Sequence, residues 1–565
     1  MTTKLLIIGG VAGGATAGAR ARRLDERAEI IIFERGEHIS FANCGLPYYI
    51  GGVIKKRSDL LVTTPEALKK RYHLDIRIFS EVLRIDRKKR EVEVKNRVTG
   101  ETYTESYDKI ILSPGAEPVK PRIEGVDLKN IFHLRNIPDS DRIKAYVDAR
   151  NPASAVVVGA GFIGLEMAEN LVERGVKTTI VERLDQVMAS LDYEMAAMVH
   201  AHLKEKGVVC RLGCGVTAFS NKGEGIVVST DKGDEIPCDM VIMSIGVRPE
   251  NRLAREAGLE ISQRGSIRVN AMMMTSDPDI FAVGDAVEVR DYVTGMPTIT
   301  ALAGPANKQG RIAADNAMGR KSVFKGTLGT SVVKLFEMTV ASTGANEKTL
   351  RQHNIPHTVS YTHSGSHASY YPGARMMAIK LIFSPGNGKI LGGQIVGMDG
   401  VDKRIDVLAT AIRGSMTVYD LEELELAYAP PYSSAKDPIN IAGFVASNIL
   451  KGDLDIILWN EMGDVDHDKE VFIDLRNKDE LEKAGSIKGA LHIPLPELRH
   501  KIQDLDREKS YIPYCAIGLR AYLGHRVLVQ NGFKSRSLSG GFKTYLGAKE
   551  KIMEESPDTK LWLSE

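Results

Sequence analysis

Two of the five cysteines lie in sequences that can give a sulfur atom a chemical role: Cys44 in SFANCGLPYYIGG and Cys515 in YIPYCAIGLR. The run from Cys515 to Arg520 is predicted to be a loop between a strand and a helix. Such a loop can direct several backbone N–H groups at the sulfur, which stabilises a thiolate or a persulfide. The remaining cysteines indicate no such chemistry. Cys210 and Cys214 lack a second pair of ligands nearby, so no metal site is predicted.

A glycine-rich turn near the N-terminus joins a predicted strand, residues 4–8, to a predicted helix. Gly9 and Gly14 fill the first and third positions of the dinucleotide-binding fingerprint GxGxxG, whereas Val11 holds the second. Glu34 ends the next predicted strand, where a carboxylate accepts a hydrogen bond from an adenosine ribose. The sequence therefore predicts a βαβ unit that binds a dinucleotide.

The same pattern recurs in complete form at residues 155–183. Gly159, Gly161 and Gly164 provide a tight turn, a close backbone approach to a pyrophosphate and close helix packing. Glu182 follows at the end of the next strand and favours NADH, because a carboxylate repels a 2′-phosphate, while the adjacent Arg183 leaves NADPH open. Two such units predict two bound nucleotides.

Composition sets the class of protein. The chain has 565 residues, of which 43% are hydrophobic and 26% charged, which is typical of a globular protein of about three or four domains. The net charge of +2 argues against nucleic acid as a partner. Five scattered cysteines indicate a reducing compartment, and no run of 18 apolar residues predicts a membrane span. The N-terminal glycines have nucleotide-turn rather than signal-peptide spacing, so a cytoplasmic location is expected.

A third element, TSDPDIFAVGDA, ends in Gly284 and Asp285. Beside two dinucleotide units it resembles the second flavin motif of the pyridine nucleotide-disulfide oxidoreductases, whose aspartate contacts the flavin ribityl chain. The resemblance implies an α/β fold with two Rossmann-like domains, for FAD and NAD(P)H, and an α+β dimerisation domain. The predicted domains are FAD-binding (1–113 and 247–322), NAD(P)H-binding (114–246), dimerisation (323–447), a linker (448–465) and a C-terminal α/β domain (466–565).

The sequence around Cys44 indicates which branch of this family the chain resembles. Dithiol members carry a second cysteine five positions on, where this chain has Tyr49. A lone cysteine at this place resembles the single-cysteine branch, which contains coenzyme A disulfide reductases, persulfide reductases, and NADH oxidases and peroxidases. The resemblance implies a redox-active Cys44 thiolate beside the flavin, and a nearby helix N-terminus is expected to lower the pKa of this thiol.

Two tyrosines favour the coenzyme A members. Tyr370 in HASYYPGA and Tyr428 in LAYAPPYSSAKD match motifs of the coenzyme A disulfide reductases, where such tyrosines come from the partner subunit and hydrogen-bond near the sulfur. The match implies a homodimer with shared catalytic sites. The same resemblance places coenzyme A against Arg20, Arg23, Ser40, Asn43 and Lys436, with arginines on its phosphates. A further basic position of that site is Tyr72 here.

The C-terminal sequence resembles a single rhodanese domain, which carries sulfane sulfur as a cysteine persulfide. Asp474 in IDLR, the Cys515 loop and the LSGG segment at 538–541 carry the resemblance. It implies that Cys515 is catalytic and that Arg520 binds substrate. A cysteine-dependent phosphatase has a loop one residue longer between the cysteine and the arginine, so the length favours sulfur over phosphate.

The fusion as a whole resembles the rhodanese-fused coenzyme A disulfide reductases. It implies an FAD-dependent NAD(P)H oxidoreductase that reduces coenzyme A persulfide, polysulfide or coenzyme A disulfide through Cys44 and releases hydrogen sulfide or thiol. Coenzyme A would be a substrate or a bound carrier of sulfur. One alternative is an NADH oxidase or peroxidase that uses a Cys44 sulfenic acid. Another is a sulfur-relay or redox-sensing module that does not turn over.

Overall fold

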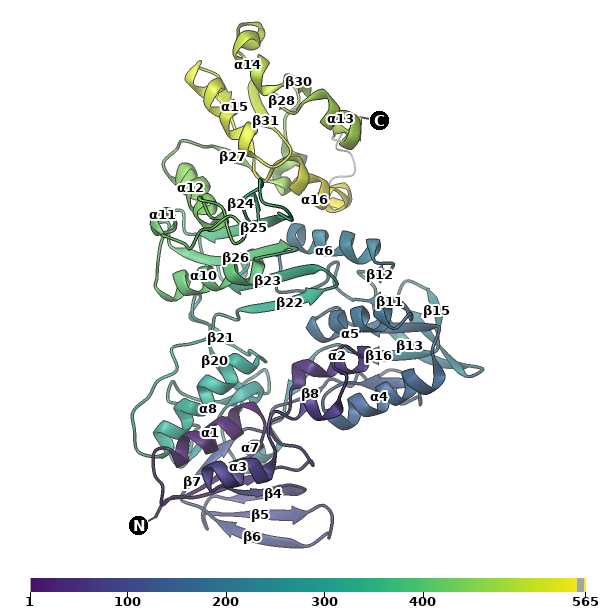
Figure 1. Ribbon diagram of the computed structural model, residues 1–565, viewed down its shortest axis with the longest axis vertical. Coiled ribbons are helices and arrows are strands. Elements are labelled where there is room, and N and C mark those ends of the chain that lie inside the picture. The colour runs from purple at the N-terminus through teal and green to yellow at the C-terminus, as the bar shows by residue number, and fades with distance from the viewer. Residues whose placement is uncertain (1, 556–562, 565) are drawn as a thin grey trace. The chain divides into compact units, whose positions relative to one another are not determined.

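The computed structural model describes residues 2–555 and 563–564. They form two compact units (Figure 1), one of Met1–Val187 and Gly207–Gly329, the other of Met188–Lys206 and Thr330–Glu565. Residues 556–562 and 565, at the end of the last predicted domain, lie outside the described part. Among the described residues, no helix is long and apolar enough to cross a membrane.

The first unit begins with a five-stranded sheet in the order β19-β7-β1-β2-β3, in which all neighbouring strands are parallel. Its apolar runs are buried on both faces, as in other parallel sheets. Helix α1 packs against α8, where a Cβ atom on Gly310 would overlap the carbonyl of Gly13. The elements are β1 (Lys4–Ile8), α1 (Ala12–Arg22), β2 (Glu29–Phe33), β3 (Asp75–Arg77), β7 (Lys109–Leu112), β19 (Ile280–Ala282) and α8 (Ala303–Ala317).

A second parallel sheet of five strands in the same unit has the order β12-β11-β10-β16-β9. Both predicted βαβ units are therefore present, and the predicted α/β fold class is confirmed. The elements are β9 (Ile131–His133), α4 (Ile137–Arg150), β10 (Ser154–Val158), α5 (Phe162–Glu173), β11 (Lys177–Val181), β12 (Val209–Arg211) and β16 (Met240–Met243).

Between the two parallel sheets the chain crosses twice, and the crossing strands pair with each other. Strand β8 (Ala116–Pro118) is antiparallel to β17 (Val247–Pro249), and the two form a two-stranded sheet. Each parallel sheet also carries a three-stranded antiparallel sheet. These are β4 (Ser80–Asp86), β5 (Glu91–Asn96) and β6 (Thr102–Ser106), and β13 (Val216–Lys222), β14 (Gly225–Thr230) and β15 (Glu235–Cys238).

The second unit contains a five-stranded antiparallel sheet in the order β22-β23-β26-β25-β24, with helices packed against it. Its strands are β22 (Ser331–Leu335), β23 (Met338–Gly344), β24 (Thr358–Gly365), β25 (Met376–Phe383) and β26 (Ile390–Gly397). Its helices are α6 (Tyr193–Glu205), α9 (Glu347–Gln352), α10 (Val401–Arg413), α11 (Val418–Glu423) and α12 (Pro438–Leu450).

The same unit ends in a smaller parallel sheet in the order β30-β28-β31-β32. Its strands are β28 (Glu470–Asp474), β30 (Leu491–His492), β31 (Ser510–Tyr514) and β32 (Lys534–Ser535), and its helices are α13 (Lys478–Ala484), α14 (Leu495–Lys501), α15 (Leu519–Gln530) and α16 (Gly541–Glu555). This sheet is the α/β core predicted for the C-terminal domain.

The predicted linker between these two parts, 448–465, contains regular structure. It holds a short strand, β27 (Ile456–Ile457), which pairs with β33 (Ser537–Leu538), and a 3-10 helix at Trp459–Asp464. Ile457 and Met462 are fully buried. The many acidic residues of this segment obscure the spacing of its buried apolar residues in the sequence.

A buried ammonium group holds α6 to the second unit, although α6 follows β11 of the second parallel sheet in the sequence. Lys380 is fully buried, and its Nζ atom lies 2.8 Å from Asp192 Oδ2, 2.5 Å from Glu194 Oε1 and 2.5 Å from Glu347 Oε2. The Tyr361 hydroxyl donates to Glu194 at 2.9 Å. These three carboxylates could hold a metal ion, but the ammonium already lies among them.

We expect Lys380→Met to destabilise the second unit by about 3–5 kcal/mol, because three buried carboxylates lose their counter-charge. Urea unfolding, followed by circular dichroism and tryptophan fluorescence, would measure the change. Lys389→Met, at an exposed turn of the same sheet, is the matched control and should change stability little. Equal stability of the two variants would contradict this account.

Candidate active sites

The first glycine turn has the geometry of a pyrophosphate cradle. Gly9 has φ +102°, and a Cβ atom there would overlap the Ser113 carbonyl, while one on Gly14 would overlap the Gly9 carbonyl. Val11, in the second fingerprint position, is the N-cap residue of α1. The Glu34 carboxylate accepts hydrogen bonds from the backbone N–H groups of residues 10 and 36, at 3.0 and 2.8 Å. Glycines thus bring the helix N-terminus and an acidic strand end together.

The second glycine turn repeats this arrangement. Gly159 has φ +99°, and a Cβ atom there would lie 2.5 Å from the Ser244 carbonyl oxygen. A Cβ atom on Gly161 would meet no protein atom within 4 Å, so the backbone before α5 is open to close approach, whereas one on Gly164 would overlap the Gly159 carbonyl. Glu182 accepts from the N–H groups of residues 160 and 184, at 2.7 and 2.8 Å. Both cradles fit the pyrophosphate of a dinucleotide.

Gly284 and Asp285 follow β19 of the first sheet in a short 3-10 turn, Gly284–Ala286. The Gly284 N–H donates to Oε1 of Gln309, a buried side chain on α8, at 2.8 Å. Burial raises the pKa of Asp285, and the Arg135 charge opposes that rise. These residues fit the flavin position that the sequence predicts, and Gln309 lies beside them.

Cys44 lies in a 3-10 turn, Asn43–Gly45, immediately before the short helix α2 (Leu46–Gly51), and its residue is exposed. The sequence predicts that a helix N-terminus lowers the pKa of this thiol. In the structure the pKa is raised, first by desolvation of the sulfur and then by the negative charges of Glu166 and Asp285. Desolvation and two carboxylates outweigh the dipole of a six-residue helix.

Glu166 is the acidic residue of the Cys44 site that sequence reasoning missed. It lies on α5, two residues after Gly164, and its Oε1 accepts a hydrogen bond from the Tyr48 hydroxyl at 3.4 Å. Burial raises the pKa of Glu166 to about 7, the Tyr48 bond opposes this shift, and the Glu169 charge adds to it. A carboxyl group that is partly protonated at neutral pH therefore lies close enough to the Cys44 sulfur to influence its charge.

The residues predicted to bind coenzyme A on the first unit fall into two groups. Ser40 and Asn43 lie on the segment that leads to Cys44, and the Ser40 N–H donates to the Gly10 carbonyl at 3.0 Å. Arg20 lies on α1, and Arg23 is the residue that caps its C-terminal end. Arg20 is already paired with an aspartate of α8, Asp315, at 2.6 Å, whereas Arg23 is exposed and lies over the Tyr72 ring at 6.0 Å.

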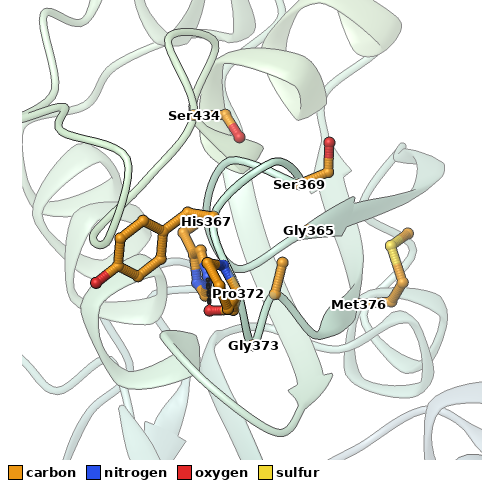
Figure 2. Close-up of a pocket in the computed structure, with 9 residues that line it drawn as sticks. Gly365, His367, Ser369, Pro372, Gly373, Met376 and Ser434 are labelled. Carbon is orange, nitrogen blue, oxygen red and sulfur yellow. Dashed lines mark hydrogen bonds between the residues drawn. The ribbon is translucent and has the colours of Figure 1, made fainter.

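Tyr370 and Tyr428 are brought together in the second unit, where their hydroxyl groups hydrogen-bond at 2.7 Å. This bond raises the pKa of Tyr370, whose side chain is 73% exposed. The residues on either side of Tyr370 in the sequence, Ser369 and Tyr371, line a cavity of about 450 Å³ together with Ser434 (Figure 2). Lys436 is exposed, two residues beyond Ser434. Segments distant in the sequence thus form one surface around the tyrosine pair.

Cys515 directly follows β31 and is 1% exposed. The sequence predicts that several backbone N–H groups point at the Cys515 sulfur; among the described residues, the Gly518 N–H, at φ +109°, donates to it at 3.2 Å. Arg520 forms two hydrogen bonds to Glu480 on α13, at 2.6 and 2.7 Å. Asp474, at the end of β28, forms a buried ion pair with Arg476 at 2.6 Å.

The segment after LSGG supports this loop from behind. The N–H groups of Phe542 and Lys543 donate to the carbonyls of residues 515 and 516, at 2.8 and 3.0 Å. A Cβ atom on Gly541 would lie 2.5 Å from the Cys515 carbonyl oxygen, so only glycine allows this close approach. Two backbone hydrogen bonds therefore fix the sulfur loop to the start of α16.

The same segment docks on strand β24 of the antiparallel sheet. The Tyr361 N–H donates to Ser539 Oγ at 3.4 Å, and His363 Nε2 hydrogen-bonds to Thr544 Oγ1 at 2.9 Å. Burial, and after it the charge of Lys543, lowers the pKa of His363 to about 3, so the ring is neutral at physiological pH. A buried neutral contact therefore joins the sulfur loop to the sheet.

Comparison with known proteins shows the family of the chain. Three family models match the chain: pyridine nucleotide-disulphide oxidoreductase over residues 3–310, the dimerisation domain of that family over 330–438, and a rhodanese-like domain over 457–548. The chain belongs to the pyridine nucleotide-disulphide oxidoreductase family, with a rhodanese-like domain at its C-terminus.

Three similar proteins have more specific names than the family. The coenzyme A disulfide reductase of Staphylococcus haemolyticus is 36% identical over 79% of this chain and its own full length. The crystal structure of reduced Bacillus anthracis CoADR-RHD is 51% identical, covers 98% of this chain and 99% of its own, and gives a TM-score of 0.95. The structure of a NAD-dependent persulfide reductase from A. fulgidus is 36% identical in sequence and gives a TM-score of 0.90. The match covers 96% of this chain and 100% of the other chain.

The pKa of Cys44 should fall in Glu166→Gln, because the variant lacks a negative charge that raises it. We expect iodoacetamide to alkylate the reduced holoprotein about threefold faster above pH 7. Below pH 6 wild-type Glu166 is itself protonated, so the two rates should converge. Mass-spectrometric labelling of Cys44 across this pH range is the measurement.

Glu173→Gln, at an exposed position on the same helix, is the matched control for this experiment. It should leave the alkylation rate unchanged. If Glu166→Gln also alkylates at the wild-type rate at every pH, the Glu166 charge does not act on Cys44.

Proposed function

We propose that this protein is an FAD-dependent NAD(P)H oxidoreductase that reduces coenzyme A persulfide, polysulfide or coenzyme A disulfide at Cys44. Hydrogen sulfide or thiol is released, and the rhodanese domain handles sulfane sulfur on Cys515. The location we propose is the reducing cytoplasm, where thiol substrates persist. The coenzyme A disulfide reductase and persulfide reductase relatives support this choice of substrates.

One observation carries the proposal: a lone exposed cysteine and a sulfur-binding loop occur in the same chain. Tyr49, in the place of a second cysteine, is buried in α2, so Cys44 has no resolving thiol there. Such a cysteine requires an external thiol partner for a disulfide. The Cys515 loop holds its sulfur with a backbone N–H, as a persulfide carrier requires.

The reaction of Cys44 with a coenzyme A persulfide needs no further reactant. The Cys44 thiolate bonds to the coenzyme A sulfur, the sulfur–sulfur bond of the persulfide breaks, and hydrosulfide leaves with the electron pair. The product is a mixed disulfide between Cys44 and coenzyme A. Glu166, with a pKa of about 7, can hold or release a proton at its carboxylate beside this sulfur.

The residues of the two glycine cradles would hold the cofactors. Gly9, Gly14 and Glu34 with Asp285 would bind FAD, and Gly159, Gly164 and Glu182 would bind the nicotinamide nucleotide. When bound, the two cofactors supply the pair of electrons that reduces the mixed disulfide. Glu182 disfavours a 2′-phosphate, so we propose NADH as the donor.

We further propose a homodimer in which Tyr370 and Tyr428 of one chain complete the Cys44 site of the other. Their mutual hydrogen bond leaves Tyr370 largely exposed, which suits a group that acts on another chain. The dimerisation-domain match supports this assembly. Arg20, Arg23, Ser40, Asn43 and Lys436 remain the residues proposed for coenzyme A.

Anaerobic stopped-flow spectroscopy of the holoprotein tests the reductase. After reduction by NADH, flavin reoxidation should be fast with coenzyme A persulfide, polysulfide or coenzyme A disulfide in the wild type, and at least a hundredfold slower in Cys44→Ser, because no thiolate is present. Hydrogen sulfide should appear with the persulfide and the polysulfide. Cys238→Ser, at a buried cysteine of the same unit, is the control.

The same experiment with peroxide as the electron acceptor distinguishes the proposed reductase from a peroxidase. Turnover on peroxide with none on the sulfur compounds would assign a peroxidase that uses a Cys44 sulfenic acid. Sulfur transfer from Cys515 without steady consumption of NADH would instead assign a relay module.

The two cysteines should be coupled through the substrate. We expect Cys515→Ala to slow NADH turnover on inorganic sulfur donors more than on preformed coenzyme A persulfide, because only the former need the sulfur loop. Steady-state NADH oxidation with both donor types measures this. Equal loss with both, or loss with neither, would show that the sites work independently.

A further inference from the structure

Tyr370 and Tyr428 lie on two connections that contain no helix or strand. The Tyr370 loop, residues 366–375, joins β24 to β25, and the Tyr428 loop, residues 424–437, joins α11 to α12. Both tyrosine side chains are exposed, so the core of the unit does not hold the rings in place. The hydrogen bond between their hydroxyl groups therefore depends on whatever holds the two loops together.

The guanidinium group of Arg404 bonds to both loops. Arg404 lies on α10 and is 1% exposed. Its Nη2 atom donates to the Ser366 carbonyl of the Tyr370 loop at 2.9 Å, and to Ser433 Oγ of the Tyr428 loop at 3.1 Å. A guanidinium is planar and rigid, so it holds acceptors from different segments in fixed directions. One buried cation thus fixes the position of one loop relative to the other.

Asp437 balances this charge and completes the cluster. Its Oδ2 atom lies 2.9 Å from Arg404 Nη2 and accepts a hydrogen bond from Ser433 Oγ at 2.6 Å. Its Oδ1 atom accepts from the Ile439 N–H at the start of α12, at 3.0 Å. The Ala368 N–H also donates to the Ser433 carbonyl at 3.0 Å, which links the loops directly. The cluster therefore orders both loops close in sequence to the two tyrosines.

We propose that Arg404 is a positioning residue for the reductase, because it holds Tyr370 and Tyr428 where their hydroxyl groups act together at the Cys44 site of the other chain. This proposal rests on the proposed role of the tyrosine pair in a homodimer. Arg404 is buried, so it acts through the tyrosines and not on the substrate. A lysine in its place would keep a charge beside Asp437, but its single nitrogen cannot reproduce the directions of the guanidinium bonds.

The test measures the two half-reactions of the Arg404→Lys holoprotein by anaerobic stopped-flow spectroscopy. We expect flavin reduction by NADH to stay within about twofold of the wild-type rate, whereas reoxidation by coenzyme A persulfide should slow about tenfold, as in Tyr370→Phe. The double variant should be no slower than the slower single variant, because both changes act through the same hydroxyl group. Effects that multiply in the double variant would contradict a role through Tyr370.

Fluorine NMR of protein labelled with 3-fluorotyrosine follows the tyrosine directly. The signal of Tyr370 is identified by its loss in Tyr370→Phe. In Arg404→Lys this signal should shift or broaden, because the loops are no longer held in one arrangement. An unchanged signal would overturn the role of Arg404.

Arg413→Lys, at an exposed position in the last turn of the same helix, is the matched control and should change neither half-reaction nor the fluorine signal. Ser433→Ala removes one hydroxyl group from the cluster but keeps both buried charges, so it gives the same test if Arg404→Lys does not fold. Its reoxidation should also slow while its reduction by NADH does not.

Tyr370→Phe separates this proposal from the function on which it rests. If reoxidation of Tyr370→Phe proceeds at the wild-type rate, the proposed role of the tyrosine pair is wrong. If Tyr370→Phe is slow but Arg404→Lys and Ser433→Ala both react like the wild type, the tyrosines act as proposed and only the role of Arg404 is overturned.

Discussion

The ammonium of Lys380 has no access to water, and this constraint decides which segments of the second unit come together. A buried cation is stable only with carboxylates around it, and the chain supplies these from α6 and α9. Helix α6 is thereby held against the antiparallel sheet of the second unit. Tyr361, which also hydrogen-bonds to Glu194, lies on β24, and its N–H donates to Ser539 in the segment that supports the sulfur loop.

Local patterns predicted the nucleotide cradles, because a glycine at positive φ, a following helix and an acidic strand end are encoded within one βαβ unit. They could not predict the placement of α6, since its two acidic residues resemble ordinary caps until Lys380, far along the chain, is placed beside them. Glu166, Gln309 and Glu480 were missed for the same reason. The domain boundaries and the roles of the site residues remain predictions.

The electrostatic surroundings of Cys44 and Cys515 have opposite effects on the two sulfur atoms. At Cys44, desolvation of the sulfur and the charges of two carboxylates raise the pKa of the thiol and so favour its neutral form. At Cys515 a backbone N–H meets the sulfur directly and the nearby ionic groups are internally paired. The surroundings of Cys44 thus disfavour its thiolate, whereas the Cys515 loop donates a hydrogen bond to its own sulfur.

The contact between β24 and the start of α16 has a consequence for transport. Backbone hydrogen bonds tie the sulfur loop to residues 542 and 543, and Thr544 is bonded to His363 on the sheet. These hydrogen bonds attach the sulfur loop to the antiparallel sheet within the second unit. In the proposed function, a loop attached in this way passes its sulfur to a diffusing carrier molecule, so the rate of transfer depends on the concentration and lifetime of that carrier rather than on the length of a linker.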